Sequence, residues 1–504
     1  MITPSSLEAA QAGPGKLPPH PTVVALAEGA VTSLDELRLQ VLSRAADGAR
    51  LVALLARPDA RELVAIVARD DRHELTVLRG ALRGTSYLSL SQELPAAQLF
   101  EREIFECHGI RPEGHPWLRP VRRHGELEGP GARPSEYPFF QVAGAGVHEV
   151  AVGPVHAGII EPGHFRFQCA GEEVLHLEIQ LGYQHRGAEA LLCTSSPSRR
   201  LAVAESIAGD TVVGHATAYA HALEALGGLE VPLRAQALRA IALELERLAN
   251  HVGDLGALCN DVGFLPGAAW LGRLRGECLG MLASLSGSRY GRGLVCLGGV
   301  NFDLDEAQRR ELLTRIGSAA TDIHRTIALV LDTPSVVSRF EQTGPLPREL
   351  GEAVGLVGPA ARACGCDRDV RRDHPAGWYR TVSLPVALEG AGDVLARARV
   401  RVREIESSLA LACEELEALP EGPISATPRP LEPKRLVASL VEGWRGEIAH
   451  VAVTDDRGML CSYKVVDPSF HNWFGLALAM RGEPISDFPL CNKSFNLSYA
   501  GHDL

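Results

Sequence analysis

Apolar residues recur three and four positions apart in two long stretches of the chain. The first runs from Leu233 to Leu258 and the second from about Val394 to Ala418. This spacing gathers the apolar side chains on one face of a helix. Gly392 precedes the second stretch, Asp393 is a suitable N-cap, and the pattern stops before Pro420. Each stretch therefore predicts a helix long enough to cross a domain.

Shorter apolar runs predict strands. The runs L-V-A-L-L-A and E-L-V-A-I-V-A flank the turn formers Arg57-Pro58-Asp59, and residues 33–46 before them have helical spacing. The segments H-E-V-A-V and H-F-R-F-Q-C predict two short strands ahead of the helical region. Near the end, E-I-A-H-V-A-V-T and M-L-C-S-Y-K-V-V predict a hairpin that turns at Gly458.

These patterns divide the chain of 504 residues, which is too long for one ordinary core. Residues 1–25 are rich in Pro, Gly and Ala and predict a flexible tail. Residues 26–122 predict an α+β domain. Residues 123–140 combine charge with Gly and Pro and predict a linker. Residues 141–504 predict a mainly α-helical domain with small β-sheets.

Composition and charge narrow the class of protein. With 46% hydrophobic and 22% charged residues, the chain has the make-up of a globular protein. Its net charge of -12 argues against binding to nucleic acid or to an anionic lipid surface. The N-terminus has no basic or apolar leader, and no apolar run is long enough to span a bilayer. We therefore expect a cytoplasmic protein whose membrane link comes through other subunits.

The eleven cysteines are scattered, and the only close pair is Cys364 and Cys366. Zinc and iron-sulfur sites usually show paired spacings such as C-x-x-C. Cysteine spacing therefore predicts reduced, mostly buried thiols and no metal cluster.

The segment E-R-E-I-F-E-C-H-G-I-R-P-E-G-H-P-W-L-R-P, residues 101–120, resembles the signature of the C subunit of NADH:quinone oxidoreductase, complex I. It departs from the family pattern at Glu106, where the family has Asp, and at Pro112, where it has Phe. The resemblance implies a domain that docks beside the catalytic subunit. His115 and Arg119 are then expected to be structural rather than catalytic.

The second domain resembles the complex I D subunit and its relative, the large subunit of membrane-bound nickel-iron hydrogenases such as that of formate hydrogenlyase. Fusion of a C-like to a D-like domain is typical of the latter. The resemblance rests on six blocks: G-P-V-H-A-G-I-I-E-P-G-H-F-R-F, L-G-Y-Q-H-R-G-A-E, E-L-E-R-L-A-N-H-V-G-D-L-G, G-S-R-Y-G-R-G-L-V-C-L-G-G-V, G-P-A-A-R-A-C-G-C-D-R-D-V-R and V-E-G-W-R-G-E-I-A-H.

The hydrogenase branch needs four cysteines, from R-x-C-G-x-C-x-x-x-H and D-P-C-x-x-C. Aligned on these motifs, the chain has Ala208 and Thr211 at the early positions and Ser469 and Asn472 at the late ones. Soft nickel and iron prefer thiolates, and these side chains are poor ligands or none. The resemblance thus implies degenerate metal-ligand positions, with no metal or other cofactor bound by this chain.

The quinone branch uses a His in the loop after the first strand and a Tyr on the following helix. Here the loop offers His156, Glu161 and His164, while the Tyr position falls near Gly209. The loop residues are suited to deliver protons to a reduced acceptor, or the two histidines satisfy backbone groups at strand ends. Asp467 beside His471 is likewise either a proton relay or a salt-bridged cap.

Family positions also indicate where electrons enter. The resemblance places His185 and Arg186 close to the terminal iron-sulfur cluster of a partner. It places Arg289, Arg292 and Arg371, together with Arg368 and Arg372, near the interface with that partner. Ordinary surface charge is the alternative explanation for the arginines.

Two functions remain open from the sequence. The leading one is an oxidoreductase subunit that passes electrons from a partner's iron-sulfur cluster to a quinone or similar acceptor, with ion translocation. The implied partners are an iron-sulfur small subunit, a ferredoxin-like subunit and antiporter-like membrane subunits, at the cytoplasmic face of the inner membrane. The alternative is a catalytically degenerate scaffold. We expect the apolar C-terminal tail to pack against the domain and not to be removed by processing. We do not expect the chain to be an active hydrogenase.

Overall fold

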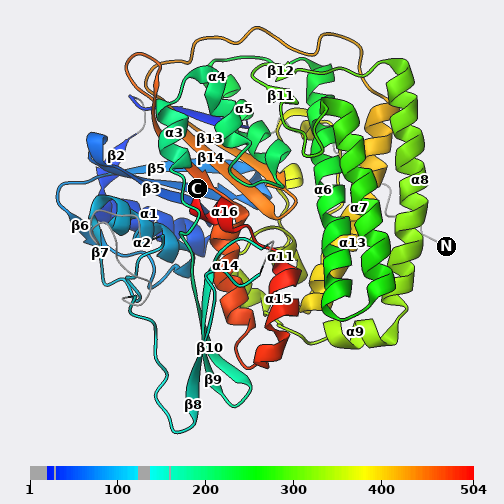
Figure 1. The fold of residues 1–504 in the computed structure, drawn as a ribbon. Helices are drawn as coiled ribbons and strands as arrows, with labels where there is room; N and C mark the ends of the chain where they lie inside the picture. The colour runs from blue at the N-terminus through cyan, green and yellow to red at the C-terminus, as the bar shows by residue number, and fades with distance from the viewer. Residues whose placement is uncertain (1–19, 28–29, 123–136, 158–159) are drawn as a thin grey trace, which may run out of the picture.

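The computed structural model describes residues 20–27, 30–122, 137–157 and 160–504. An N-terminal α/β unit packs against a larger, mainly helical unit that carries small sheets (Figure 1). The fold class predicted from the sequence is therefore confirmed.

The N-terminal unit is built on a four-stranded sheet in the order β2-β5-β4-β3. Ser33 caps α1 by accepting a hydrogen bond from the Glu36 N–H at 3.2 Å, and Leu37 and Val41 of this helix are buried. Nearly every residue of β3 and β4 is buried, so both faces of the sheet are covered. The elements are β2 (Val31–Ser33), α1 (Leu34–Ala46), β3 (Arg50–Arg57), β4 (Glu62–Arg69), β5 (Glu74–Ala81), β6 (Ser86–Leu88), α2 (Gln98–His108) and β7 (Arg111–Glu113).

Four long helices form a bundle on the side of the molecule opposite the N-terminal unit (Figure 1). Helix α6 spans Leu233–Asp261 and α13 spans Val394–Glu417, which confirms both predicted helices. Asp393 caps α13 by accepting a hydrogen bond from the Ala396 N–H at 2.8 Å. The other two helices are α7 (Leu265–Ser286) and α8 (Glu306–Leu331), and all four contribute to one hydrophobic core.

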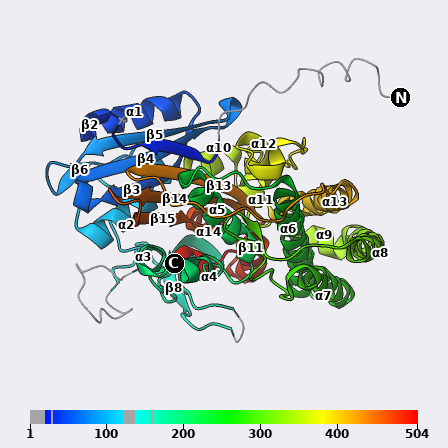
Figure 2. The same cartoon turned by 90° about the horizontal axis from the view of Figure 1, so that it is seen from above.

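A second sheet, in the order β1-β13-β14-β15, lies between the bundle and the N-terminal sheet (Figure 2). The predicted hairpin is confirmed as β14 (Gly446–Thr454) and β15 (Leu460–Val466), with Gly458 at φ +76° in its turn. Strand β13 (Arg435–Gly443) was not predicted. Apolar residues of β13 and β14 share one core with β3, β4 and α2, so the two units are packed sheet against sheet.

The N-terminal strand β1 (Thr22–Ala25) pairs antiparallel with β13. The prediction of a flexible tail to residue 25 is therefore wrong for these four residues, because backbone hydrogen bonds to a distant strand hold them. Residues 1–19 of the predicted tail and 123–136 of the predicted linker lie outside the described residues. Tyr137, which follows them, is buried.

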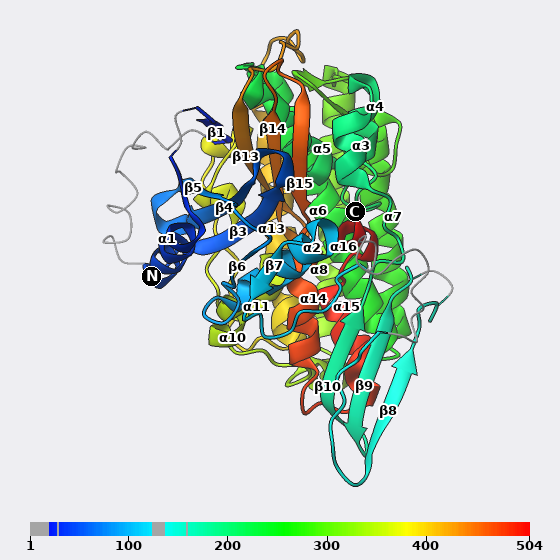
Figure 3. The same cartoon turned by 90° about the vertical axis from the view of Figure 1, so that its left-hand side faces the viewer.

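A three-stranded sheet of β8 (Val147–Val152), β9 (His164–Ala170) and β10 (Glu173–Gln180) projects from the larger unit (Figure 3). The first two are the predicted short strands. The base of this sheet packs on α14 (Pro468–Ala479) and α15 (Phe488–Phe495) in a separate apolar core. The turn between β8 and β9 is thereby brought to the C-terminal helix α16 (Tyr499–Asp503).

Ion pairs, one buried and one half-buried, also join the two units. Lys464 on β15 lies 2.6 Å from the Glu103 carboxylate of α2, and Arg50 on β3 contacts both Asp70 and Glu447. No helix within the described residues is long and apolar enough to cross a membrane. The remaining elements are α3 (Ala188–Thr194), α4 (Pro197–Ala204), α5 (Val212–Leu226), β11 (Val295–Cys296), β12 (Gly299–Val300), α9 (Pro334–Phe340), α10 (Arg348–Ala353), α11 (Gly358–Ala363), α12 (Val370–Asp373) and short 3-10 turns.

Candidate functional site

The loop between β8 and β9 meets the C-terminal helix. The His156 Nε2 atom lies 3.3 Å from the phenol oxygen of Tyr499, and Glu161 Oε2 accepts hydrogen bonds from the Tyr499 and Ala500 N–H groups at 3.1 and 3.2 Å. Burial raises the pKa of Glu161 and lowers that of His156. The structure thus gathers an imidazole, a phenol and a carboxyl group around one residue of α16.

His164, the third predicted residue of this loop, is held by its own hairpin. Its Nδ1 atom lies 3.2 Å from the Gly153 carbonyl oxygen, and its Nε2 atom accepts a hydrogen bond from Arg166 Nε at 3.2 Å. Burial lowers its pKa. Both ring nitrogens are therefore occupied, which is the arrangement of a histidine that satisfies groups at a strand end. A catalytic role for His164 stays a prediction.

Asp467 lies at the start of α14 and is buried. Its Oδ1 atom accepts from the Ser469 N–H at 2.8 Å, and its Oδ2 atom lies 3.0 Å from His215 Nε2. Burial opposes ionisation, but the hydrogen bond from His215 and the charge of the nearby Arg445 outweigh it and lower the pKa of Asp467. The predicted partner, His471, makes no such contact and packs edge-on against Phe100. Pairing Asp467 with His471 was therefore wrong.

The four predicted metal-ligand positions lie close together in sequence motifs but hold no thiolate. Ala208 has no ligand atom, and Thr211 Oγ1 accepts from Arg445 at 3.2 Å. Ser469 Oγ accepts from the Ser498 N–H at 2.9 Å. The Asn472 amide pairs with both backbone groups of Val357, at 3.1 and 3.0 Å. Each polar atom is thus engaged within the protein.

This donor set does not fit a nickel-iron centre, which requires soft sulfur ligands. Among the described residues no group of three or more His, Cys, Asp and Glu side chains is arranged to hold a metal ion. That the chain carries no metal remains a prediction for metal analysis.

Arg445 donates a hydrogen bond to Thr211, one of these positions, and was missed by the sequence analysis. Its guanidinium makes a two-point ion pair with Asp210, at 2.6 and 2.8 Å, and lies 3.9 Å from the centre of the Trp444 ring. Burial opposes ionisation of Asp210, but Arg445 outweighs it and lowers the pKa of this carboxyl group. The only sequence signal was the W-R-G turn between two strands, which does not reveal what the arginine contacts.

The predicted electron-entry residues His185, Arg186, Arg289 and Arg292 are exposed. Arg186 donates to the Ser206 and Ile207 carbonyl oxygens, and Arg292 reaches the Ser206 hydroxyl at 3.4 Å. Arg186 also donates to the Ala500 carbonyl oxygen at 3.2 Å. Through Ala500, the exposed basic group touches the same backbone segment that Glu161 binds.

Arg371 does not belong to this exposed group. Only 5% of it is accessible, and it pairs with Asp369 at 2.7 Å and with Glu244 at 3.1 Å in the interior. Arg371 is therefore not exposed to a partner, because its charge is neutralised inside the chain, and its expected place near the partner interface stays a prediction. Its neighbours Arg368 and Arg372 are half-buried.

Within the described residues, the side chains of His115 and Arg119 contact neighbours in the N-terminal unit. His115 Nδ1 accepts from the Trp117 N–H at 3.0 Å, its Nε2 atom lies 3.2 Å from the Gln98 carbonyl oxygen, and Arg119 stacks on the Trp117 ring at 4.6 Å. These contacts support the expected structural role.

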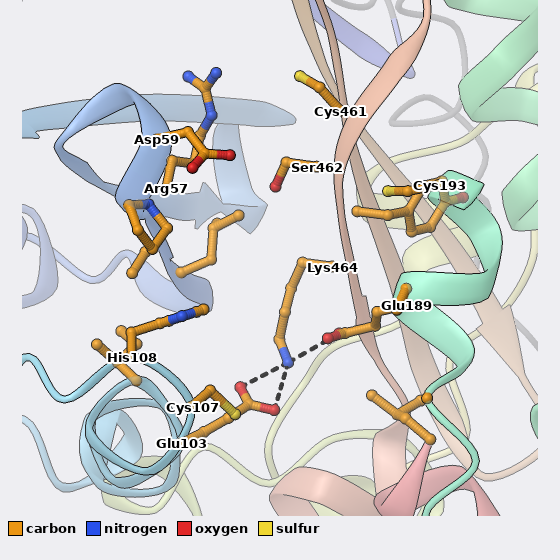
Figure 4. A pocket seen from close by; sticks show the side chains of 18 of the residues that line it. Arg57, Asp59, Glu103, Cys107, His108, Glu189, Cys193, Cys461, Ser462 and Lys464 are labelled. Atoms are coloured by element: carbon orange, nitrogen blue, oxygen red, sulfur yellow. Dashed lines mark hydrogen bonds and ion pairs between the residues drawn. The ribbon is translucent and has the colours of Figure 1, made fainter. Parts of the chain in front are cut away.

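Two cavities lie where the two units meet. One of about 550 Å³ is lined by residues of β3, α2, α3 and β15, including Glu103, Glu189 and Lys464 (Figure 4). The other, of about 420 Å³, is lined by α2, β10 and α14. Neither is lined by His156, Glu161, His164 or Asp467, so these two interdomain cavities and the predicted catalytic residues are separate features.

Comparison with known proteins defines the class to which this fold belongs. Residues 39–135 match the family of the 30 kDa subunit of respiratory-chain NADH dehydrogenase, and residues 261–437 match that of the 49 kDa subunit. One polypeptide therefore contains regions that match two different subunit families.

Relatives that align with most of the chain show which proteins it is similar to. The chain is 31% identical to formate hydrogenlyase subunit 5 of Escherichia coli over 439 residues, which cover 83% of the chain and 77% of that protein. It is 31% identical to hydrogenase-4 component G of the same organism, covering 82% and 75%, and to NADH-quinone oxidoreductase subunit 4 of Thermus thermophilus, covering 67% and 89%. The chain belongs to the family that unites complex I subunits with the large subunits of such hydrogenases.

Proposed function

We propose that the chain is the acceptor-reducing subunit of a membrane-associated oxidoreductase complex. Electrons arrive from an iron-sulfur cluster of a small partner subunit and pass to a quinone or similar acceptor. A ferredoxin-like subunit and antiporter-like membrane subunits complete the complex, which lies on the cytoplasmic face of the inner membrane and couples electron transfer to ion translocation.

One observation carries this proposal: the pairing of His156 with Tyr499 at 3.3 Å. The related quinone enzymes require a His and a Tyr, and the usual Tyr position falls near Gly209 here. Tyr499 supplies a phenol from the opposite end of the domain. A quinone carbonyl oxygen accepts hydrogen bonds, and a phenol and a protonated ring nitrogen are suitable donors for it.

Reduction of a quinone to a quinol consumes two electrons and two protons. His156 and Tyr499 bind the acceptor oxygen and supply a proton to it as charge develops. Glu161 accepts a hydrogen bond from the Tyr499 N–H, and burial raises its pKa. It is therefore suited to replace that proton. The exposed group around Arg186 reaches Ala500, so electron entry and acceptor reduction share one segment of α16.

The test uses the purified complex with its co-purifying subunits. Iron and nickel are determined, and reduction of a soluble quinone analogue is measured with the iron-sulfur partner kept reduced. Iron without nickel, together with quinone reduction, is the expected result. Stoichiometric nickel in this chain overturns our account of Ala208, Thr211, Ser469 and Asn472.

A matched pair of variants locates the acceptor. Tyr499→Phe removes the phenol that contacts His156 and is expected to lower kcat/KM for the quinone analogue at least tenfold. Tyr219→Phe makes the same change at a buried tyrosine elsewhere and serves as the control. Equal activity of the two variants contradicts binding of the acceptor at Tyr499.

A scaffold role is the second candidate, and one observation favours it. The polar atoms of Thr211, Ser469 and Asn472 are all engaged internally, and the arginine that binds Thr211, Arg445, is itself paired with Asp210. A scaffold predicts that His156, Glu161 and Asp467 are each replaceable with little effect on turnover. Changes at exposed Arg289 then disrupt assembly instead.

A further inference from the structure

Four buried side chains from four different elements form one hydrogen-bonded line. Asp467 Oδ2 lies 3.0 Å from His215 Nε2 on α5, and His215 Nδ1 lies 3.2 Å from His450 Nε2 on β14. His450 Nδ1 lies 2.8 Å from the phenol oxygen of Tyr463 on β15. The accessible fraction is 0% for both histidines, 1% for Asp467 and 6% for Tyr463.

The hydrogen bonds of this line have a defined direction when its rings are neutral. An ionised Asp467 only accepts, so His215 Nε2 donates to it. A neutral imidazole has one donor and one acceptor, so His215 Nδ1 accepts from His450 Nε2, and His450 Nδ1 accepts from the Tyr463 hydroxyl. Burial keeps the pKa of His450 well below its usual value, so this ring is neutral. All three donors then point towards Asp467.

A second arrangement of the same four groups differs by one shift along the line. The Tyr463 O–H bond breaks as His450 Nδ1–H forms. The His450 Nε2 proton passes to His215 Nδ1, and the His215 Nε2 proton passes to Asp467. The net result is one proton moved from the Tyr463 oxygen to the Asp467 carboxylate, with no change in electrons. Burial raises the pKa of Tyr463, so its oxygen must take a replacement proton as it gives one up.

The two ends of the line lie in different surroundings. Tyr463 lines the interdomain cavity of about 550 Å³, together with Cys193 and Lys464. Asp59 and Cys461 also line this cavity and are exposed, which gives it access to solvent protons (Figure 4).

The other end of the line, Asp467, lies near charged side chains. Arg445 and Asp210 act on the Asp467 carboxylate, and Gly501 lies so close that a Cβ atom there would meet it at 2.6 Å. Asp467 is thereby fixed in place next to α16, the helix that carries Tyr499.

We propose that Tyr463, His450 and His215 conduct protons from the interdomain cavity to Asp467, as the proton supply of the acceptor-reducing site. This inference rests on the proposed function, because it assigns the line to the protons consumed there. The groups that face the line from neighbouring elements are Tyr219 and Cys193 at Tyr463, and Arg445, Asp210 and His471 at Asp467.

Tyr219 provides a matched control for the test. Its ring lies 6.3 Å from that of Tyr463 in the same apolar core, and its hydroxyl has no hydrogen-bond partner among the described residues. Tyr463→Phe and Tyr219→Phe therefore remove one phenol oxygen each from similar surroundings, and only the first removes a member of the line.

The experiment follows quinone-analogue reduction by the purified complex in H₂O and D₂O. Tyr463→Phe is expected to lower turnover at least tenfold and to increase the solvent isotope effect, whereas Tyr219→Phe changes turnover less than twofold. Equal turnover and an equal isotope effect in the two variants overturn the proposal and leave the line a structural one.

A second readout is independent of the acceptor. Infrared difference spectra of the complex, recorded on reduction of the partner's cluster, report protonation of carboxyl groups. A carboxyl band that is lost in Asp467→Asn and delayed in Tyr463→Phe supports conduction even when the wild-type complex reduces no quinone. A band that is unchanged in Tyr463→Phe contradicts it. Failure of the proposed function is thereby separated from failure of the proton line.

Discussion

The protein buries polar groups in two regions with opposite chemistry. Within the helix bundle and against β13, eight ionisable side chains form a network in which carboxylates meet guanidinium groups: Glu244, Arg247, His251, Arg362, Asp369, Arg371, Glu404 and Glu442. The line from Tyr463 to Asp467 contains two imidazoles, a phenol and a carboxylate.

The two regions differ in whether their side chains can release and take up protons. A guanidinium group does not deprotonate in proteins, so the positive charges of the arginines in the network stay fixed. Burial opposes ionisation of Glu404, but Arg362 and His251 outweigh it and hold its pKa well below the usual value. The imidazoles of the line have donor and acceptor sites that exchange. The network thus secures the fold, while the line is suited to move protons.

The largest expected effect is loss of a charge from the network. Glu404 lies 2.7 Å from Arg362 and 2.9 Å from His251, all fully buried. Glu404→Gln leaves buried positive charge uncompensated and is expected to lower the free energy of unfolding by about 3–5 kcal/mol. Urea unfolding of the full chain measures this change.

Glu306 is the matched control, because it makes similar ion pairs with Arg309 and Arg310 on the surface of α8. Glu306→Gln is expected to leave the urea midpoint unchanged, since exposed ion pairs are screened by solvent. If both variants unfold at the wild-type midpoint, the network does not stabilise the fold.

Elements that depend on local pattern were predictable from the sequence. Helix α13, with its Asp393 cap and its stop before Pro420, and the hairpin at Gly458 follow from spacing and turn residues within a short window. Strand β1 was not predictable in this way. Its pairing with β13 joins residues more than four hundred positions apart, and nothing in T-V-V-A specifies that partner.

The site shows the same limit. Asp467 was identified from its motif, but sequence proximity indicated His471 as its partner, while the fold supplies His215 from α5. Tyr499 and Arg445 were missed because their roles arise from contacts between distant segments. The burial of Arg371 was not foreseen, because a matched family position does not reveal that Glu244 and Asp369 neutralise its charge in the interior.

The second prediction concerns His471, a buried ring that belongs to neither region. Burial lowers its pKa to about 4, below the value of about 6.5 expected in the unfolded chain. Unfolding therefore takes up a proton as the pH falls from about 6.5 to about 4. Stability is lost in this window, by up to about 3 kcal/mol.

Replacing His471 by Gln removes this titration. The free energy of unfolding of His471→Gln is expected to depend less steeply on pH between 6.5 and 4, by about one proton. Urea titrations across this range measure the slope. His148, which is exposed, is the control position. A slope in His471→Gln identical to that of the wild type rules out a buried neutral His471.

A smaller effect is expected at the predicted late metal position. Asn472→Ala leaves the N–H and carbonyl groups of Val357 unpaired in the interior and is expected to cost about 1–3 kcal/mol. Asn472→Cys loses the same two hydrogen bonds and is expected to destabilise by a similar amount without gaining nickel. Tight nickel binding by Asn472→Cys would show that the position is a metal site that lacks only its thiol.

The smallest effect is expected for Ser469→Ala, which removes one acceptor from the Ser498 N–H at 2.9 Å. A single hydrogen bond of this kind contributes about 1 kcal/mol to stability. Ser407, whose hydroxyl donates to a carbonyl oxygen on the exposed face of α13, is the control. Ser469 and Asp467 hold the same turn at the start of α14, so Ser469→Ala is expected to lower the free energy of unfolding. Its rate of quinone reduction is expected to fall less than that of Tyr463→Phe. The reverse order of activities would place the serine hydroxyl, and not the line, at the reacting centre.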